Sequence, residues 1–169
     1  RGEPFVRHVA RAALAAGLSP VVVVTGCAAD SVEAALGDLP VSFAHNPEWQ
    51  AGQSGSVKTA VQALPSETGA AVFLLADQPH TPAQLIASLV EAHAGSLSPL
   101  VAPLVQGQRA NPVLFDRRTF PELLGLSGDQ GGRVLFSRYP ARWVPWHDPR
   151  LLLDVDTPED YRRLLDEQP

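Results

Sequence analysis

The stretch AVFLLADQP, residues 71–79, decides the fold because a continuous apolar run is followed at once by a polar turn. Apolar residues fill positions 71–76, which is typical of a strand buried on both faces of a parallel sheet. Pro79 cannot continue a central strand, so we expect the strand to end at Asp77 or very near it. Ligands of open α/β sheets bind beyond the carboxyl ends of the strands, so Asp77 is predicted to lie at the rim of a site. The alternative is that Asp77 caps the following helix, for which Thr81–Pro82 already offers a start signal.

Composition and charge exclude several classes of protein. With 169 residues, the chain fits one domain with a substantial core. Its formal net charge of −5 and its lack of a basic stripe argue against a nucleic-acid binder and against binding to an anionic membrane. Cys27 is the single cysteine, which rules out an internal disulfide and favours a reducing, cytoplasmic compartment. No apolar stretch approaches the ~20 residues of a membrane helix, and no secretory signal is visible.

Strand-like and helix-like patterns alternate over most of the chain. The predicted strands are 21–26 (VVVVTG), 41–46 (VSFAHN), 71–77, 141–146 (ARWVPW) and 151–156 (LLLDVD). The predicted helices include 3–16, 57–64, 82–93 and 158–166, with Ser54 or Ser56 as the N-cap of the second. Residues 98–116 indicate two strands joined at a hairpin-like turn, 106–108. The alternation predicts a three-layer α/β/α sandwich, and the strand pair predicts a mixed sheet.

A second acidic segment is LLLDVDTPEDY, residues 151–161. If Thr157 caps the final helix, Asp156 is left at the end of the predicted strand, where it could face Asp77 across the rim. Two carboxylates, together with substrate phosphates and waters, are the usual way in which a protein holds Mg²⁺. The alternative is that Asp156 is itself the helix N-cap, with Glu159 as its capping-box partner.

A glycine- and serine-rich loop lies within NPEWQAGQSGSVKTA, residues 46–60. Gly52 and Gly55 permit a close approach of the backbone to a ligand, and Ser54 and Ser56 add hydroxyl groups. The helix that follows offers free N–H groups and the positive end of its dipole, which suits an anionic or polar ring ligand. The alternative is that the loop is only a turn.

Two further segments carry polar groups, RANPVLF (109–115) and SGDQGGR (127–133). Asn111 and Arg133 could bind a phosphate or the edge of a heterocycle, or could equally be surface residues. The five histidines show no metal-ligand spacing, and His80 is of interest only because it follows Asp77 closely.

With these residues in place, the chain resembles the MobA-like nucleotidyltransferases, and among them the molybdenum-cofactor cytidylyltransferases. The segments that carry the resemblance occur in the family's order and span nearly the whole chain. They are VVVVTG, NPEWQAGQSGSV, FLLADQP, NPVLFD, SGDQGGR and DVDTPEDY.

The resemblance implies a Rossmann-like, GT-A-like nucleotidyltransferase fold with a mostly parallel mixed sheet. It implies that Asp77 and Asp156 are catalytic and coordinate Mg²⁺. The implied nucleotide-binding residues are Gly52, Ser54, Gly55, Ser56 and Asp77. The residues implied to face the pterin substrate are Asn111, Gly128, Asp129, Gln130 and Arg133.

The reaction implied by the resemblance is nucleotidyl transfer. The terminal phosphate of molybdopterin would attack the α-phosphate of CTP and release pyrophosphate, and a molybdenum hydroxylase would receive the finished cofactor. Two alternatives stay open: transfer from GTP or to another phosphorylated acceptor, and a non-catalytic carrier of the molybdenum cofactor.

The chain departs from the family pattern in three places. The family begins with a strand and a Gly-rich loop whose Arg and Lys hold the triphosphate, and the chain is interpreted as a single domain, 1–169, without that strand and loop. Ala76 stands where the family commonly has glycine, and Gly55 stands where it commonly has serine.

Overall fold

The computed structural model describes residues 2–153 and Val155. The helices are α1 (Phe5–Ala15), α2 (Ala29–Leu36), α3 (Gln53–Gln62), α4 (Ala83–Ser96) and α5 (Phe120–Leu124), with 3₁₀ turns at Trp49–Ala51, Arg117–Thr119, Gly132–Ser137 and Pro149–Leu152. The strands are β1 (Val22–Thr25), β2 (Ser42–His45), β3 (Ala70–Phe73), β4 (Leu100–Val105), β5 (Gln108–Arg109), β6 (Val113–Asp116) and β7 (Ala141–Trp146).

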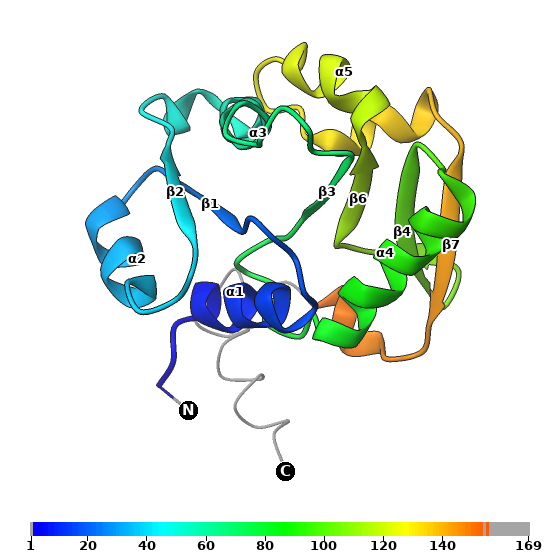
Figure 1. Ribbon diagram of the computed structural model, residues 1–169, viewed down its shortest axis with the longest axis horizontal. Coiled ribbons are helices and arrows are strands. Elements are labelled where there is room, and N and C mark those ends of the chain that lie inside the picture. Colours follow the sequence, from blue (N-terminus) through cyan, green and yellow to red (C-terminus); the bar gives the residue numbers. More distant parts are fainter. Residues whose placement is uncertain (1, 154, 156–169) are drawn as a thin grey trace.

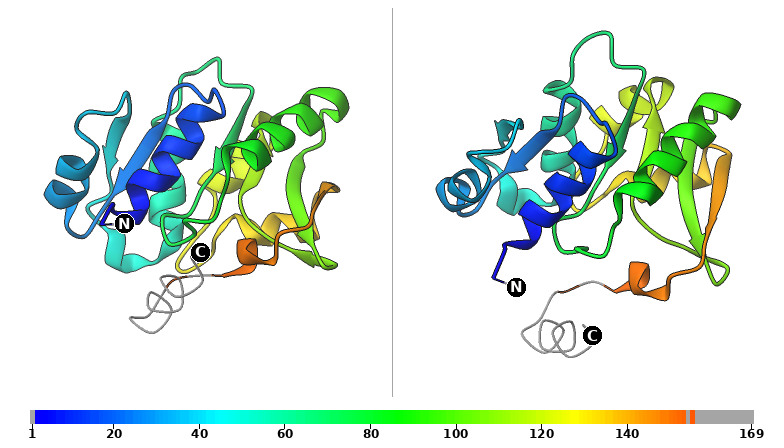
Figure 2. Two further views of the ribbon diagram at one scale, coloured as in Figure 1. Left: turned by 90° about the horizontal axis from the view of Figure 1, so that it is seen from below. Right: turned by 60° about the horizontal axis from the view of Figure 1, so that its bottom comes forward.

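Helices cover both faces of the strands, which confirms the predicted three-layer α/β/α fold. α3 and α5 lie on one side and α1 and α4 on the other (Figure 1). Seen from below, α1 and α4 lie in front of the strands (Figure 2). Among the described residues, none of these helices combines the length and apolar composition required to traverse a bilayer.

Strand β4 explains why a continuous apolar run becomes a buried strand. Leu100 and Ala102 belong to the core cluster that also holds residues of α3 and α5. Val101 and Val105 point the other way, into the cluster that holds residues of α4. All four side chains are fully buried, because β4 lies between both helical layers.

The strands form a mixed arrangement, as predicted. β4 pairs with β5 and β6 in antiparallel orientation and with β7 in parallel orientation, and β3 pairs with β6 in antiparallel orientation. β1 and β2 form a separate parallel pair. The β4–β5 ladder confirms the predicted hairpin-like turn near 106–108.

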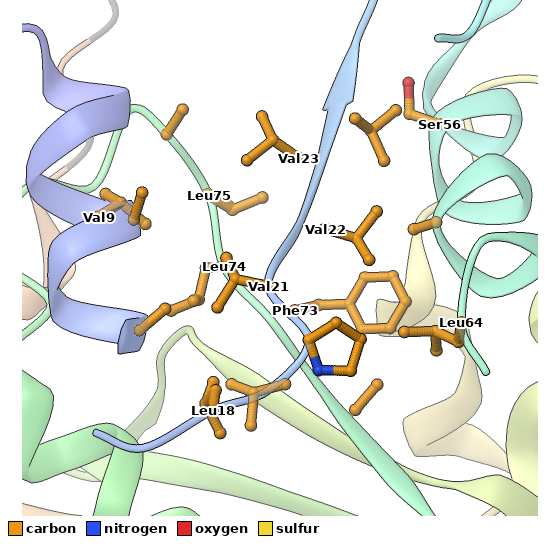
Figure 3. Close-up of a pocket in the computed structure, with 18 of the residues that line it drawn as sticks. Val9, Leu18, Val21, Val22, Val23, Ser56, Leu64, Phe73, Leu74 and Leu75 are labelled. Carbon is orange, nitrogen blue, oxygen red and sulfur yellow. The ribbon is translucent and has the colours of Figure 1, made fainter. Parts of the chain in front are cut away.

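An apolar cavity separates β1 from β3 and the residues that follow it. Its volume is about 460 Å³, and its walls come from α1, β1, α3 and residues 70–76. In Figure 3, Val22 and Val23 of β1 and the segment Phe73–Leu75 run in the same direction. Within the described part of the chain, the cavity-facing edges of β1 and β3 pair with no other strand. Two open strand edges therefore face each other across apolar space.

The central strand is shorter than the sequence suggests. β3 ends at Phe73, which pairs with Val113, the first residue of β6. The prediction that the strand extends to Asp77 is therefore wrong by four residues, because Leu74 and Leu75 border the cavity and lack a strand partner there.

The predicted strand 151–156 is wrong for residues 151 and 152. Pro149–Leu152 forms a 3₁₀ turn where the sequence suggests a strand beginning at residue 151. Asp148 caps this turn by accepting a hydrogen bond from the backbone N–H of Arg150, so a local cap outweighs the apolar pattern. Asp156 and the predicted helix 158–166 lie outside the described residues.

Asp116 anchors the end of β6. Its carboxylate lies 2.8 Å from Nε2 of His93 and accepts hydrogen bonds from the backbone N–H and Nε of Arg118 at 2.9 and 2.8 Å. Burial acts to raise the pKa of Asp116, but the hydrogen bonds from Arg118 and His93 outweigh it and hold the pKa below its ordinary value of 3.8.

We expect Asp116→Asn to lower the free energy of unfolding at neutral pH by about 2 kcal/mol, because hydrogen bonds to a buried charge are lost. A depressed folded-state pKa contributes stability above the ordinary value of 3.8, and this contribution disappears as the pH falls through the folded-state pKa. Urea unfolding should therefore show that the difference in free energy of unfolding between wild type and Asp116→Asn is smaller near pH 2 than at neutral pH. Glu91→Gln, at an exposed carboxylate of α4, is the control. Equal midpoints for Asp116→Asn and wild type at neutral pH would contradict this account.

Candidate active site

The turn after β3 holds Asp77 in a half-buried position. The Oδ1 atom of Asp77, Oε1 of Gln78 and Nε2 of His80 are all buried. His80 also lies near Asp148, whose pKa is lowered first by the hydrogen bond from Arg150 and, among lesser causes, by the charge of His80. The turn thus carries several polar groups away from bulk water.

The chain returns to Asp77 near its C-terminal end. The backbone N–H of Val155 donates to the carbonyl oxygen of Asp77 at 3.1 Å. This bond joins Val155 to the turn after β3. Asp156, the second predicted ligand, lies outside the described residues.

The donor set is suited to a metal shared with substrate rather than held by protein alone. The described residues contain no group of three or more His, Cys, Asp and Glu side chains that could hold an ion. Mg²⁺, however, is usually bound by one or two carboxylates, with phosphates and waters completing its shell. Asp77 therefore fits the chemistry of such a site.

Asn46 fixes the loop in front of α3. It follows β2, is only 3% exposed, and its backbone N–H donates to Thr25 at 2.8 Å. Its Nδ2 donates to Oγ of Ser56 at 3.1 Å, and its Oδ1 accepts from the N–H of Glu48 at 3.0 Å. A Cβ on Gly55 would lie 3.0 Å from this Nδ2, so the small residue makes room for the Asn46 side chain.

The glycine-serine loop and the SGDQGGR loop are joined to each other. Gly52 has φ +113°, and a Cβ there would lie 2.5 Å from the carbonyl carbon of Gly128 and 2.9 Å from the nitrogen of Asp129. The N–H of Ser54 donates to the Gly128 carbonyl at 3.1 Å, and that of Gln53 donates to Asp129 Oδ1 at 3.4 Å. The close approach that Gly52 permits is thus to another loop of the protein.

These contacts correct the predicted start of the helix. α3 begins at Gln53, and Ser54 is buried within its first turn, so the prediction of a serine N-cap for a helix beginning at residue 57 is wrong. The physical reason is that Gly128 and Asp129 satisfy the first N–H groups of α3 from a distant part of the sequence.

The remaining residues of the SGDQGGR loop pack against the same region. A Cβ on Gly131 would lie 3.0 Å from Cδ of Gln53, and one on Gly132 would lie 2.5 Å from Cζ of Phe115. Gln130 closes its own loop, because its Oε1 accepts from the N–H of Ser127 at 3.4 Å. The loop is therefore held to α3 and β6.

The structure brings the two predicted groups of site residues together. Gly52–Ser56 and Gly128–Asp129 are in direct contact, and exposed Arg133 follows in the same loop. Half-buried Asn111 precedes β6, whose first residue pairs with the last residue of β3, the strand that leads to Asp77. Asn111 therefore lies at the end of β6 that meets the end of β3.

A carboxylate beyond the end of a strand and a pair of joined glycine-rich loops, in a three-layer α/β fold, are typical of an enzyme that handles nucleotides. The chain belongs to the MobA-like NTP transferase family, because the model of the MobA-like NTP transferase domain matches residues 1–144. This confirms the resemblance drawn from the sequence and makes the chain a nucleotidyltransferase.

Two relatives match most of the chain. The chain is 30% identical over 174 residues to nicotine blue oxidoreductase of Paenarthrobacter nicotinovorans, covering 98% of this chain and 84% of that protein. It is 35% identical over 127 residues to the bifunctional protein GlmU of Syntrophotalea carbinolica, covering 74% of this chain and 27% of that protein.

Solved structures give the same result for the fold. Rv0371c from Mycobacterium tuberculosis H37Rv has a TM-score of 0.83 at 27% identity, over 96% of this chain and 84% of that one. A structure of Rv0371c in complex with manganese has a TM-score of 0.81 at 26% identity, over 97% of this chain and 86% of that one.

The sequence patterns do not single out Asn46, which organises the loop before α3. A signal was present, because Asn46 is a polar residue directly after a strand, as Asp77 was expected to be. Its burial and its bonds to both Ser56 and Glu48 could not be read from that position.

We expect Gly52→Ala to destabilise the protein by about 2 kcal/mol or more, because a side chain at φ +113° is strained and overlaps the Gly128 backbone. Chemical unfolding monitored by circular dichroism measures the effect. Gly95→Ala is the matched control: it lies in α4 with no atom within 4 Å of the added Cβ, and it should be neutral or stabilising. An equal loss of free energy of unfolding in Gly52→Ala and Gly95→Ala would contradict the close approach of Gly52 to the Gly128 backbone.

Proposed function

We propose that this nucleotidyltransferase transfers CMP from CTP to the terminal phosphate of molybdopterin and releases pyrophosphate. The observation that carries the proposal is the half-buried carboxylate of Asp77 in the turn after β3, whose backbone carbonyl accepts a hydrogen bond from Val155. The two connected glycine loops support it. Membership of the MobA-like family and the sequence resemblance to the cytidylyltransferases support it. A molybdenum hydroxylase would take up the product.

The reaction is an in-line displacement at phosphorus. An oxygen of the acceptor phosphate forms a bond to the α-phosphorus of CTP, while the bond from that phosphorus to the bridging oxygen breaks and pyrophosphate leaves. The protein contributes mainly by positioning two anionic reactants and by electrostatic stabilisation. Gly52–Ser56 would hold the nucleotide, and Asn111 with Gly128–Arg133 would face the acceptor.

Asp77, together with Asp156, would hold Mg²⁺. The ion would neutralise charge on the phosphates when bound. The manganese complex of Rv0371c supports a divalent cation in this family.

We expect Asp77→Ala to lower the rate of pyrophosphate release by about a hundredfold or more while leaving the unfolding midpoint close to wild type. The measurement is pyrophosphate release by the full-length protein with molybdopterin and Mg²⁺, with CTP and GTP in parallel. Glu91→Ala, at an exposed position of α4, is the control. Near-normal turnover by Asp77→Ala would overturn the role given to this residue.

The same assay separates the alternatives. Release with GTP alone would make the protein a guanylyltransferase that uses the same site. Tight binding of molybdopterin without release from either nucleotide would make it a carrier. The 30% identity to nicotine blue oxidoreductase favours one further candidate, reduction of an aromatic dye, which is tested by decolorisation of nicotine blue with a hydride donor.

We also propose that an extended apolar strand, followed by the Gly-rich triphosphate loop of the family, completes the site by filling the cavity between β1 and β3. The cavity is lined by aliphatic side chains of both strands, and Val22, Val23 and Val24 are only half-buried. A strand inserted parallel to β1 would precede α1 and pair with both open edges, giving the usual right-handed β-α-β unit.

The occupancy of the cavity is tested with residues 1–169 and with a form extended ahead of Arg1 by the family's strand and loop. We expect the extended form to bind less of a hydrophobic dye and to show slower amide exchange at Leu74 and Leu75, because their backbone becomes paired. Unchanged dye binding and exchange would show that the strand lies elsewhere.

A further inference from the structure

A stack of three side chains lies on the face of the sheet that packs against α3 and α5. The guanidinium carbon of Arg109 is 4.5 Å from the centroid of the Phe136 ring. Phe136 stacks on Trp143, with ring centroids 5.7 Å apart and planes inclined by 18°. The strand register brings them together, because Arg109 pairs with Leu104 and Trp143 pairs with Ala102 on the same strand, β4.

A second cation, Arg133, lies in the same 3₁₀ turn as Phe136, Gly132–Ser137. Burial lowers the pKa of Arg109, and the charge of Arg133 lowers it further. Within the described residues neither forms an ion pair, whereas Arg7 and Arg118 are each paired with an aspartate. Two neighbouring cations without a carboxylate partner attract an anion.

Both arginines belong to segments that hold residues proposed to face the acceptor. Arg133 ends the loop in which Gly131 and Gly132 pack against Gln53 and Phe115. Arg109 precedes Asn111, which leads into β6 at the end where β6 pairs with the last residue of β3.

We propose that Arg109, Arg133 and Trp143 bind a phosphorylated planar heterocycle, which on the function proposed above is the acceptor. Arginine donates paired N–H groups to a phosphate, and packing on Phe136 holds the Arg109 guanidinium in one orientation. Trp143 is 39% exposed, so part of its ring system is open to stacking by the heterocycle. The cations would also reduce repulsion between the acceptor phosphate and the nucleotide triphosphate.

The test compares flavin mononucleotide with riboflavin, which share a planar ring system and differ by a phosphate, and then uses molybdopterin itself. We expect the full-length wild type to bind flavin mononucleotide at least tenfold more tightly than riboflavin. Arg109→Ala and Arg133→Ala should each lose about tenfold in affinity for the phosphorylated probes and most of the preference for phosphate. Trp143→Ala should weaken both flavins alike.

Arg142→Ala is the matched control, because Arg142 is an exposed neighbour of Trp143 whose strand partner, Val101, belongs to the opposite core. This variant should keep wild-type affinity for the probes, and CTP affinity should change little in any variant. Arg109→Lys, which keeps the charge but not the paired donors, guards against a folding defect and should fall between wild type and Arg109→Ala.

Two results distinguish this inference from the proposed function. Folded Arg109→Ala and Arg133→Ala proteins that bind the phosphorylated probes as tightly as wild type would overturn the inference. Arginine-dependent binding of these probes, without pyrophosphate release from CTP and molybdopterin, would keep the binding site and contradict the cytidylyl transfer.

Discussion

At Gly52 the backbone of one loop passes so close to Gly128 that no side chain fits between them. The organisation of the site depends on this contact. The carbonyl of Gly128 and the carboxylate of Asp129 replace a local cap at the start of α3, which fixes where the helix begins. Because Gly131 packs on Gln53 in the same way, the loop proposed for the nucleotide and the loop proposed for the acceptor form one connected unit.

The sequence predicts well those elements whose partners are set by their own pattern. Apolar runs correctly indicated β1 and β4, and the turn at 106–108 correctly indicated antiparallel strands. The places where sequence reasoning fails share one cause, which is dependence on a distant segment. β3 stops where β6 begins, at Phe73 opposite Val113, and no local signal records that register.

The candidate site likewise contains residues that local sequence predicts and residues whose role depends on distant segments. Asp77 was recognisable because a polar turn follows an apolar run, and that argument needs only local sequence. Asn46 holds the corresponding position after β2, but its importance comes from hydrogen bonds to Ser56 and Glu48 that only the folded loop creates. The stack of Arg109 on Phe136 requires β5, the 3₁₀ turn Gly132–Ser137 and β7 to converge, which no spacing rule predicts.

The distribution of charge connects these observations to function. A protein with a formal net charge of −5 that brings two phosphate-bearing reactants together must concentrate its cations locally. Arg7 and Arg118 are neutralised by aspartates within the fold and serve its stability. Arg109 and Arg133 form no such ion pairs within the described residues, and the guanidinium of Arg109 packs on the ring of Phe136 instead. Packing on an aromatic ring holds the Arg109 guanidinium in place without neutralising its charge, so Arg109 keeps its electrostatic attraction for an anionic ligand.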